Sequence, residues 1–213
     1  MKMMRIDTRK QNVFFTSDTH FSHFNIIRYC ERPYKNTDEM DEDLVKRWNE
    51  RVGKNDIVFH LGDFGMVNQK KLEEIVGRLN GRIYFIRGNH DRPWNIDGVF
   101  ELVRESMTVN IDGVIVHMSH HPLLNCGCEV VEGKRLVQLY GHVHTREKMC
   151  TYDKLRTAMT AWNQYDVGVD NNNYAPVSFA EVMHIIRERR RVEKGFWNSM
   201  LRRLIEKLYM MKL

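Results

Sequence analysis

The segment Val13–His20, which reads VFFTSDTH, decides how the first half of this chain folds. Residues 13–16 form a short apolar run that is typical of a buried strand. The run ends at Ser17, so the predicted strand delivers Asp18 and His20 at its carboxyl end. The same arrangement, a strand followed by polar residues that can bind a ligand, recurs along the chain.

Strands and helices alternate after this segment. Residues 37–52 and residues 72–79 carry apolar side chains at helical spacing. Further strands are predicted over residues 57–61 and 83–86. The order strand, helix, strand, helix, strand with short links is typical of a parallel α/β sheet. We therefore expect such a sheet at the front of the chain.

The second half of the chain is predicted to be mostly β. Residues 106–111 and 114–119 flank Asp112-Gly113, which is a strong hairpin signal. Residues 136–140 and 165–169 are typical of further strands. The sheet formed by these segments would have to pack against the parallel strands of the first half.

Two helical segments are predicted at the end of the sequence. The capping box Ser178–Glu181 opens a helix that we expect to run to about Arg191. A basic amphipathic helix follows Lys194-Gly195. Its apolar stripe consists of Trp197, Met200, Leu201, Leu204, Ile205 and Leu208. The sequence thus predicts one domain over residues 1–191 and a basic amphipathic helical tail over residues 192–213.

The tail holds most of the positive charge. The chain has a net charge of +5, and residues 187–213 carry 9 Lys or Arg against 3 Glu. The remaining body is nearly neutral, so the overall charge says little about what the body binds. We expect the tail to pack on its own domain or on a second subunit. The alternatives are another partner or an anionic surface.

Length and composition limit the class of protein. A chain of 213 residues can bury a core without disulfide bonds. The four cysteines include no C-x-x-C pair, and the N-terminal residues do not read as a signal peptide. No apolar run approaches the ~20 residues that a membrane span needs. We therefore expect a cytoplasmic protein with reduced thiols and no transmembrane segment.

Five groups of potential ligands follow the predicted strands. They are Asp18-Thr-His20, Gly62-Asp63, Gly88-Asn89-His90-Asp91, Ser119-His120-His121 and Gly141-His142-Val-His144. Ligands collect at the carboxyl ends of strands in an open α/β sheet, so these groups are expected to form one site. Carboxylates, imidazoles and one amide suit divalent transition metals: manganese first, with iron, zinc, cobalt or nickel as alternatives. Seven such side chains exceed the needs of one ion, so two ions are predicted.

The spacing inside two of these groups suggests how they present their side chains. Asp18 and His20 are two residues apart, as are His142 and His144. On an extended chain both members of such a pair point to the same side. We therefore expect each pair to lie on extended backbone.

In this order the blocks resemble the D-x-H, G-D, G-N-H-D/E, H and G-H-x-H motifs of the calcineurin-like metallophosphoesterase superfamily. The resemblance covers Val13 to about Val169, and the first block continues to Asn25 as in the small bacterial and phage branch. It implies an α/β fold, a two-sheet mixed β-sandwich flanked by helices. By this resemblance one ion is bound by Asp18, His20, Asp63 and His144. The other is bound by Asp63, Asn89, His120 and His142, with Asp63 bridging.

Four residues in or near the blocks have alternative roles as metal ligands, substrate contacts or surface residues. Either His120 or His121 could supply the ligand of the fourth block. The resemblance favours His120, which stands one residue before the His121-Pro122 pair, and leaves His121 to contact substrate. His23 and Asn25 follow the first block and are also expected to contact substrate, with a surface turn as the alternative reading.

The predicted chemistry is hydrolysis of a phosphate ester. Two ions about 3.5–4 Å apart can hold a bridging hydroxide for in-line attack on phosphorus. His90 is not needed as a ligand, and histidine exchanges protons near neutral pH, so His90 is expected to protonate the leaving group. Asp91 is expected to orient His90.

The predicted substrate is a phosphate mono- or diester at a nucleotide or a nucleic-acid end. The sequence between Asp91 and His120 contains no insertion large enough to form a cap domain, so the site should be open to such a substrate. The alternative function is a non-catalytic binding module that keeps the same scaffold. The histidine of the G-N-H-D block, His90, favours the enzyme.

Overall fold

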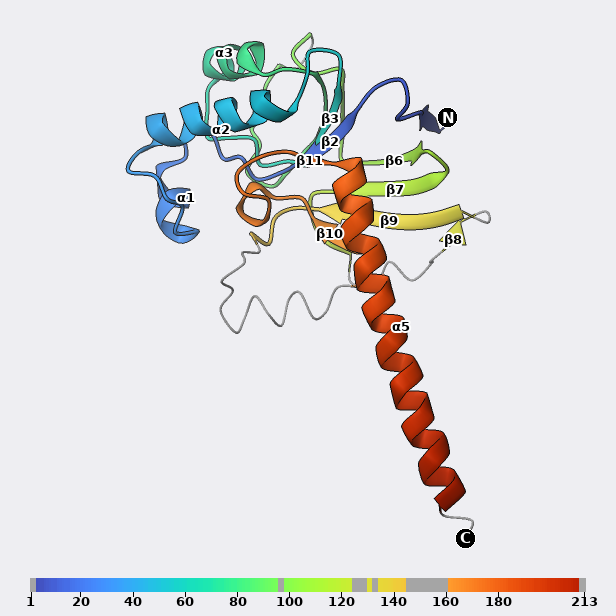
Figure 1. The fold of residues 1–213 in the computed structure, drawn as a ribbon. Helices are drawn as coiled ribbons and strands as arrows, with labels where there is room; N and C mark the ends of the chain where they lie inside the picture. Colours follow the sequence, from blue (N-terminus) through green and yellow to red (C-terminus); the bar gives the residue numbers. More distant parts are fainter. Residues whose placement is uncertain (1–2, 96–97, 124–129, 132–133, 145–160, 211–213) are drawn as a thin grey trace.

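The computed structural model describes residues 3–95, 98–123, 130–131, 134–144 and 161–210. Two β-sheets lie face to face, and three helices cover the outer face of one of them (Figure 1). A long C-terminal helix leaves this body. The architecture is the predicted α/β sandwich of two mixed sheets flanked by helices.

The first sheet has the strand order β11-β2-β3-β4-β5. Its three central strands are parallel. They are β2 (Val13–Thr16), β3 (Ile57–His60) and β4 (Arg82–Ile86). β5 (Leu102–Arg104) adds a parallel edge, and β11 (Val177–Ser178) pairs antiparallel with β2. The predicted central strands are confirmed.

Helices connect the parallel strands across the outer face of this sheet. They are α1 (Phe24–Tyr29), α2 (Thr37–Arg51) and α3 (Gln69–Arg78). Two asparagines cap the longer helices: the side chain of Asn36 accepts the N–H of Glu39 at 2.9 Å, and Asn68 accepts that of Lys71 at 3.0 Å. The sequence predicted α2 and α3 and missed α1.

The second sheet has the order β1-β6-β7-β9-β10, with β8 paired to β9. Its strands are β1 (Met4–Ile6), β6 (Ser106–Ile111), β7 (Val114–Ser119), β8 (Val130–Val131), β9 (Lys134–Tyr140) and β10 (Gln164–Asp166). The predicted hairpin joins β6 to β7, and its turn residues Asp112 and Gly113 have φ of 48° and 86°. β9 runs parallel to both β7 and β10.

Successive side chains of the first sheet face different layers. Phe15 and Phe59 point between the sheets, where their ring centroids are 5.7 Å apart and Val116 and Leu139 belong to the same apolar cluster. Phe14 instead packs with the cluster under the helices. Both faces of the sheet are thus buried, which explains why its strands read as continuous apolar runs.

Helix α5 (Phe179–Met210) runs without interruption past residue 191. It begins at the predicted capping box, where Ser178 Oγ donates to Glu181 Oε2 at 2.6 Å. The predicted end near Arg191 is wrong, because a single glycine such as Gly195 costs a helix only about 1 kcal/mol.

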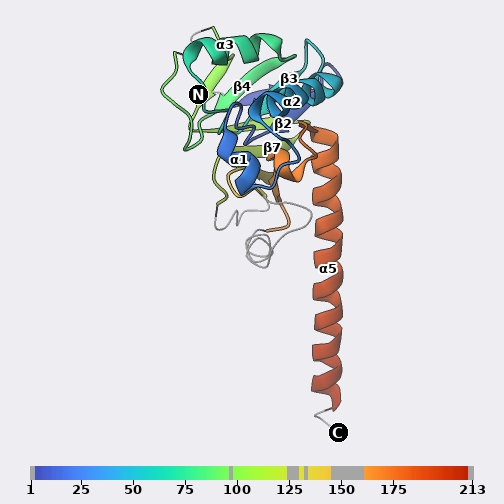
Figure 2. The same ribbon diagram turned by 90° about the vertical axis from the view of Figure 1, so that its left-hand side faces the viewer.

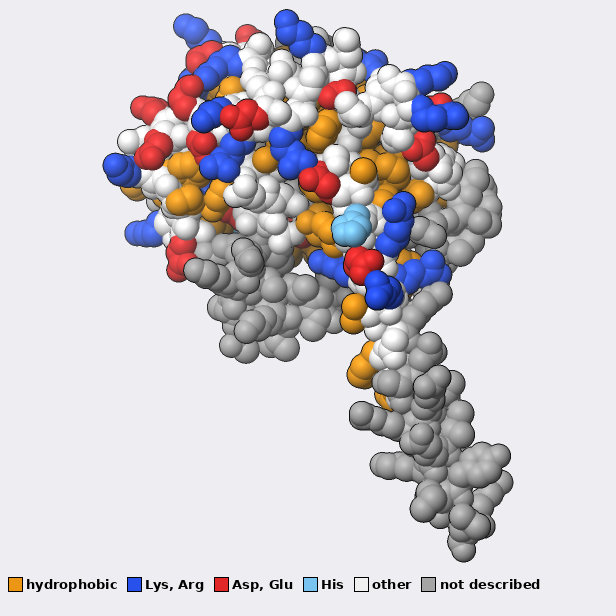
Figure 3. Space-filling model, in the orientation of Figure 1, with side chains coloured by type: hydrophobic (Ala, Val, Ile, Leu, Met, Phe, Trp, Pro, Cys, Tyr) orange, Lys and Arg blue, Asp and Glu red, His pale blue; other side chains and the backbone are white. Residues whose placement is uncertain are grey.

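The two ends of α5 have different environments. Val182, Met183 and Ile186 are buried in the core between the sheets. Farther along, α5 projects away from the body (Figures 1 and 2), and Val192 and Phe196 are 72% and 61% exposed. Lys and Arg side chains gather where the helix leaves the body (Figure 3). The described apolar side chains Val192, Phe196 and Met200 are thus exposed and give no support to the expected packing of this segment on its own domain.

No helix of the described chain has the length and apolar character required to cross a membrane.

Substitutions on α5 should separate its two environments. Ile186→Ala should lower the free energy of unfolding by about 2–5 kcal/mol, because it leaves a cavity between the sheets. Val192→Ala should change it by no more than about 0.5 kcal/mol. Urea unfolding of the full chain measures both. An equal cost for the two variants would mean that the projecting part of α5 packs on the body.

Candidate metal centre

The predicted ligands lie at the carboxyl ends of five strands drawn from both sheets. Asp18 and His20 follow β2, Asp63 follows β3, Asn89 follows β4, His120 follows β7, and His142 and His144 follow β9. Because β2, β3 and β4 are parallel, and β7 is parallel to β9, the ligand loops of each sheet come together at one edge. The structure thus brings the five blocks into one region.

Asp63 occupies the middle of this region. Its Oδ2 atom lies 3.3 Å from His120 Nε2 and 3.6 Å from His20 Nε2. Asn89 Oδ1 is 3.0 Å from the same His120 nitrogen. The burial of Asp63 alone would raise its pKa, but the hydrogen bond and charge of His120 hold that pKa well below the usual range of a carboxyl group.

The remaining ligands complete two groups around Asp63. Potential ligand atoms of Asp18, His20 and His144 all lie within 4.8 Å of one another, as do those of Asp18, Asp63 and His120. On the other side, the ring centroids of His120 and His142 are 5.1 Å apart. Burial and the charge of His120 lower the pKa of His142 to about 4, so this imidazole is neutral at physiological pH.

Five of the seven predicted ligands have left-handed backbone. The φ angles are 57° at Asp18, 51° at His20, 54° at Asp63, 71° at His142 and 48° at His144. The expected extended pairs are therefore wrong: β2 ends at Thr16 and β9 at Tyr140, and the paired side chains converge through turns. Each such residue costs about 1–3 kcal/mol and persists where its surroundings enforce it.

Main-chain hydrogen bonds enforce this geometry. The amide of His90 donates to Asp63 Oδ1 at 2.8 Å, and the amide of His142 donates to both carboxylate oxygens of Asp18, at 3.0 and 2.9 Å. The amide of His20 donates to the carbonyl of Asp63 at 3.0 Å. Each ligand loop is thus fixed by a group of another ligand loop.

Asp91 has partners other than the expected one. Its carboxylate accepts the amides of Gly88, Asp63 and Phe64 at 2.6, 2.9 and 2.8 Å. Among the described contacts, none joins this carboxylate to the ring of His90. Asp91 therefore ties the loop after β4 to the loop after β3.

Oxygen atoms behind two of the inner histidines orient their rings. His120 Nδ1 donates to the carbonyl of Leu61 at 2.8 Å, which turns Nε2 toward Asp63. His144 Nδ1 is 2.7 Å from Asp170 Oδ2, and its Nε2 lies 3.8 Å from Asp18 Oδ1. A carboxylate or carbonyl behind a histidine is the usual way to orient a metal-ligating imidazole.

Asp170 and Arg32 belong to this region and were missed by sequence reasoning. Arg32 donates to both oxygens of Asp170 at 2.9 Å, and both side chains are fully buried. Arg32 also donates to the carbonyls of Asp18 and Thr19, at 2.7 and 2.9 Å. Asp170 lies in a 3₁₀ turn, η1 (Val169–Asn171), just beyond the predicted strand 165–169, so the same strand-end rule could have found it.

The charged groups of Arg32, Asp170 and His144 shift one another's pKa values. The burial of Asp170 would raise its pKa, but Arg32 and His144 keep that pKa well below its usual range. The burial of His144 opposes its charged form, yet Asp18 and Asp170 outweigh this effect and raise its pKa to about 11. The carboxylates of Asp18 and Asp170 thus favour a positive charge at this position.

One buried atom tests whether a metal fits this cluster. His20 Nε2 has no hydrogen-bond partner, although the residue is only 1% exposed. A buried polar atom without a partner is rare and costs free energy. Burial and the nearby His144 lower the pKa of His20 to about 2, so this imidazole is neutral and has a lone pair available for a metal ion. The donor set and this atom together fit a divalent cation.

The other predicted site residues surround the cluster. The ring of His90, which is exposed, lies 5.6 Å from that of His20, and His23 Nδ1 is 3.1 Å from His20 Nδ1. The exposed ring of His121 is 4.3 Å from that of His142. Of the two adjacent histidines, His120 is thus the one that contacts Asp63. Asn25 is exposed on α1, and no described contact joins it to the cluster.

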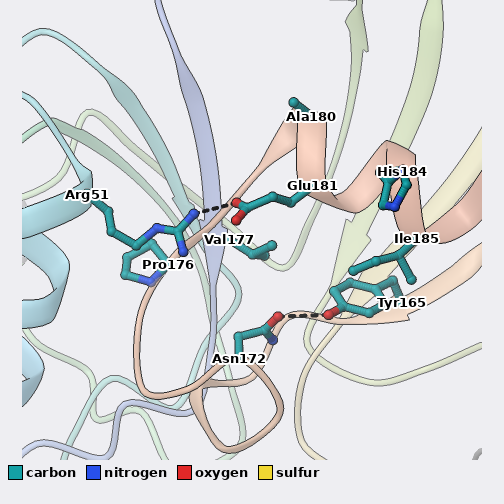
Figure 4. A pocket seen from close by; sticks show the side chains of 9 residues that line it. All are labelled: Arg51, Tyr165, Asn172, Pro176, Val177, Ala180, Glu181, His184 and Ile185. Carbon is teal, nitrogen blue, oxygen red and sulfur yellow. Dashed lines mark hydrogen bonds and ion pairs between the residues drawn. The ribbon is translucent and has the colours of Figure 1, made fainter.

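A surface pocket of about 510 Å³ lies elsewhere, between α2, η1 and the start of α5 (Figure 4). Its charged residues Arg51 and Glu181 form an ion pair, and Tyr165 donates to Asn172 at 2.8 Å. None of the seven predicted ligands lines this pocket. The pocket is therefore separate from the candidate metal centre.

Residues 12–158 match the sequence model of the calcineurin-like phosphoesterase superfamily domain, and the chain belongs to that superfamily. An uncharacterized protein of Methanocaldococcus jannaschii is 44% identical over 123 residues, or 52% of this chain and 70% of that protein. The gene 66 protein of Mycobacterium phage D29 is 30% identical over 188 residues, or 75% of this chain and 88% of that protein.

A solved structure shares the fold. The crystal structure of a protein of unknown function from Aquifex aeolicus has a TM-score of 0.64 and 23% sequence identity, covering 82% of this chain and 99% of that one. Superfamily membership assigns this chain to the phosphoesterase class, and it agrees with the divalent-metal chemistry of the ligand set.

A glycine substitution should test the close approach of the ligand loops. A Cβ atom at Gly88 would overlap the amide nitrogen and Oδ1 of Asp63, so Gly88→Ala should abolish tight metal binding. The matched control is Gly77→Ala in α3, where an added Cβ meets nothing within 4 Å. Replacing a glycine inside a helix by alanine should stabilise the fold by about 0.5–1 kcal/mol. Elemental analysis and thermal unfolding measure the two effects. Normal metal content in Gly88→Ala would show that the loops tolerate separation.

Proposed function

We propose that this protein is a binuclear metal-dependent phosphoesterase that hydrolyses phosphate mono- or diesters at a nucleotide or a nucleic-acid end. The observation that supports it most is the position of the Asp63 carboxylate, 3.6 Å from His20 Nε2 and 3.3 Å from His120 Nε2. The two imidazoles approach the carboxylate from different sheets. A carboxylate shared in this way is suited to bridge two cations.

The proposed ligand sets are those that the family resemblance implies. Asp63 belongs to both sets. The first ion would be held by Asp18, His20, Asp63 and His144, and the second by Asp63, Asn89, His120 and His142. Manganese is the ion we expect first, and iron, zinc, cobalt and nickel suit the same donors. When bound, the ions would supply an activated water and neutralise charge on the phosphoryl oxygens.

His90 is proposed to donate the proton that the leaving group needs. Its amide is anchored on Asp63, and its exposed ring lies 5.6 Å from the ring of His20, at the solvent side of the cluster. His23, whose ring is 6.3 Å from that of His90, and His121 beside His142 are proposed to contact the substrate. Asp91 holds the loop that carries His90 in place.

The chemistry is proposed to belong to residues 1–191, because all five ligand blocks end before residue 145. Residues 192–213 would form an appendage that contacts a second subunit, another partner or an anionic surface. Its exposed apolar residues Val192 and Phe196 and its five Lys or Arg residues support a contact of this kind. A cytoplasmic location stays a prediction.

Replacing His90 should distinguish proton donation from metal binding. His90→Ala should keep both ions and the fold, and should slow the hydrolysis of alkyl and ribose esters by about 10² to 10⁴. Nitrophenyl esters should lose less rate, because nitrophenolate leaves with little help from a proton. The measurement compares kcat for the two kinds of ester at constant metal content.

The control is Asp63→Ala, which should abolish turnover of every ester together with metal binding. Equal losses for aryl and alkyl esters in His90→Ala would contradict proton donation and assign phosphate binding to His90. Unchanged rates on all esters would exclude His90 from the chemistry and favour the binding-module alternative.

A further inference from the structure

Large apolar side chains are exposed beside the ligand loops. Phe24 and Tyr29, on α1, are 64% and 62% exposed, while Met66 follows the Asp63 loop and Leu123 follows His121. The other exposed large apolar residues of the described chain are Met3 near its start and three residues of α5. Four of the five such side chains on the described body thus follow a ligand block in the sequence. Phe24 and Tyr29 share one short helix, and exposed apolar groups that gather in one place indicate a binding surface.

Helix α1 has one buried and one outward face. Ile26 is buried in the cluster beneath the helices, which fixes the rotation of α1 about its axis. Phe24, Asn25, Arg28 and Tyr29 are all exposed. The Arg28 guanidinium lies 5.4 Å from the centroid of the Tyr29 ring. Phe24 and Arg28, four residues apart, lie on the same side of the helix. The outward face thus combines two aromatic rings, an amide and a cation.

Both ends of α1 are joined to the candidate metal centre. His23 directly precedes Phe24, and its Nδ1 is 3.1 Å from His20 Nδ1. Arg32, three residues after the helix, donates to the carbonyl of Asp18 at 2.7 Å and to Asp170 in η1. Figures 1 and 2 accordingly show α1 beside the orange turn that follows β10. Helix α1 therefore lies next to the candidate metal centre.

We propose that this outward face binds the base of a nucleotide whose phosphate lies at the metal centre. The inference rests on the proposed function and adds to it the residues that select the substrate. A base would stack on Phe24, with Arg28 and Asn25 beside it to interact with its polar edge or with a neighbouring phosphate. Stacking of one base on an aromatic side chain contributes about 1–3 kcal/mol.

Two features favour a nucleobase over another apolar group. The cation and the amide on the same face suit a flat ring with polar edges, and an alkyl chain would make no use of them. The site next to it concentrates groups that recognise phosphate. The same chemistry is present in a free nucleotide and in the terminal nucleotide of a single strand.

A pair of ligands that differ only in the base should test the proposal. The affinities of the metal-loaded full chain for adenosine 5′-monophosphate and for ribose 5-phosphate are measured by calorimetry. The wild type should prefer the nucleotide by about 5- to 150-fold, the range that corresponds to 1–3 kcal/mol. Phe24→Ala should lose most of this preference, and Phe24→Trp should keep it. A dinucleotide and a short single-stranded oligonucleotide then distinguish a free nucleotide from a strand end.

Phe196→Ala is the matched control. Phe196 is a similarly exposed phenylalanine on the projecting part of α5, so its replacement should leave the preference unchanged. A wild type without the preference, or a Phe24→Ala variant that retains it, overturns the base-binding surface and leaves the phosphoesterase proposal intact. The protein could also prefer the nucleotide, lose this preference in Phe24→Ala, and hydrolyse no ester. That result would support the base-binding surface and contradict the proposed hydrolysis.

Discussion

The buried carboxylate of Asp63 is the group on which the rest of the site depends. It accepts the amide of His90, lies between His20 and His120, and stands on left-handed backbone at the end of β3. Burying a carboxylate costs free energy unless donors or cations surround it. The loops after β2, β4 and β7 each supply a group to this carboxylate.

Buried carboxylates and cationic groups face one another in this region. Asp18, Asp63 and Asp170 are three buried carboxylates, and Arg32 is the buried guanidinium that pairs with Asp170. Burial opposes the charged forms of His120 and His144, yet Asp63 raises the pKa of His120, and Asp18 and Asp170 raise that of His144 to about 11. Divalent ions would displace these protons and neutralise the carboxylates in their place. The three carboxylates thus suit the binding of cations.

Several parts of this structure could be predicted from local sequence. The hairpin strands 106–111 and 114–119 agree with β6 and β7 at both ends, because Asp112-Gly113 fixes the turn and the apolar pattern fixes the register. The convergence of the ligand blocks also followed from local patterns, since parallel strands that end in polar groups must place them at one edge.

The remaining features depend on contacts that are distant in sequence. The pair of Arg32 and Asp170 joins residues 138 positions apart, and α1 has only six residues and no side-chain cap. The left-handed backbone at Asp18 and His20 arises from hydrogen bonds with the loop after β3, and Asp91 finds its partners there as well. Such arrangements are set by tertiary packing, and the secondary-structure propensities of single residues give no signal for them.

Metal stoichiometry tests the central claim most directly. Chelator-treated full-length protein is titrated with Mn²⁺, and bound and free ions are counted by electron paramagnetic resonance. The account predicts saturation at two ions per chain in the wild type, and loss of both tight sites in Asp63→Ala, because the two ligand sets share this carboxylate. Saturation at one ion in fully active protein, or two tight sites that survive in Asp63→Ala, would contradict a binuclear centre built on Asp63.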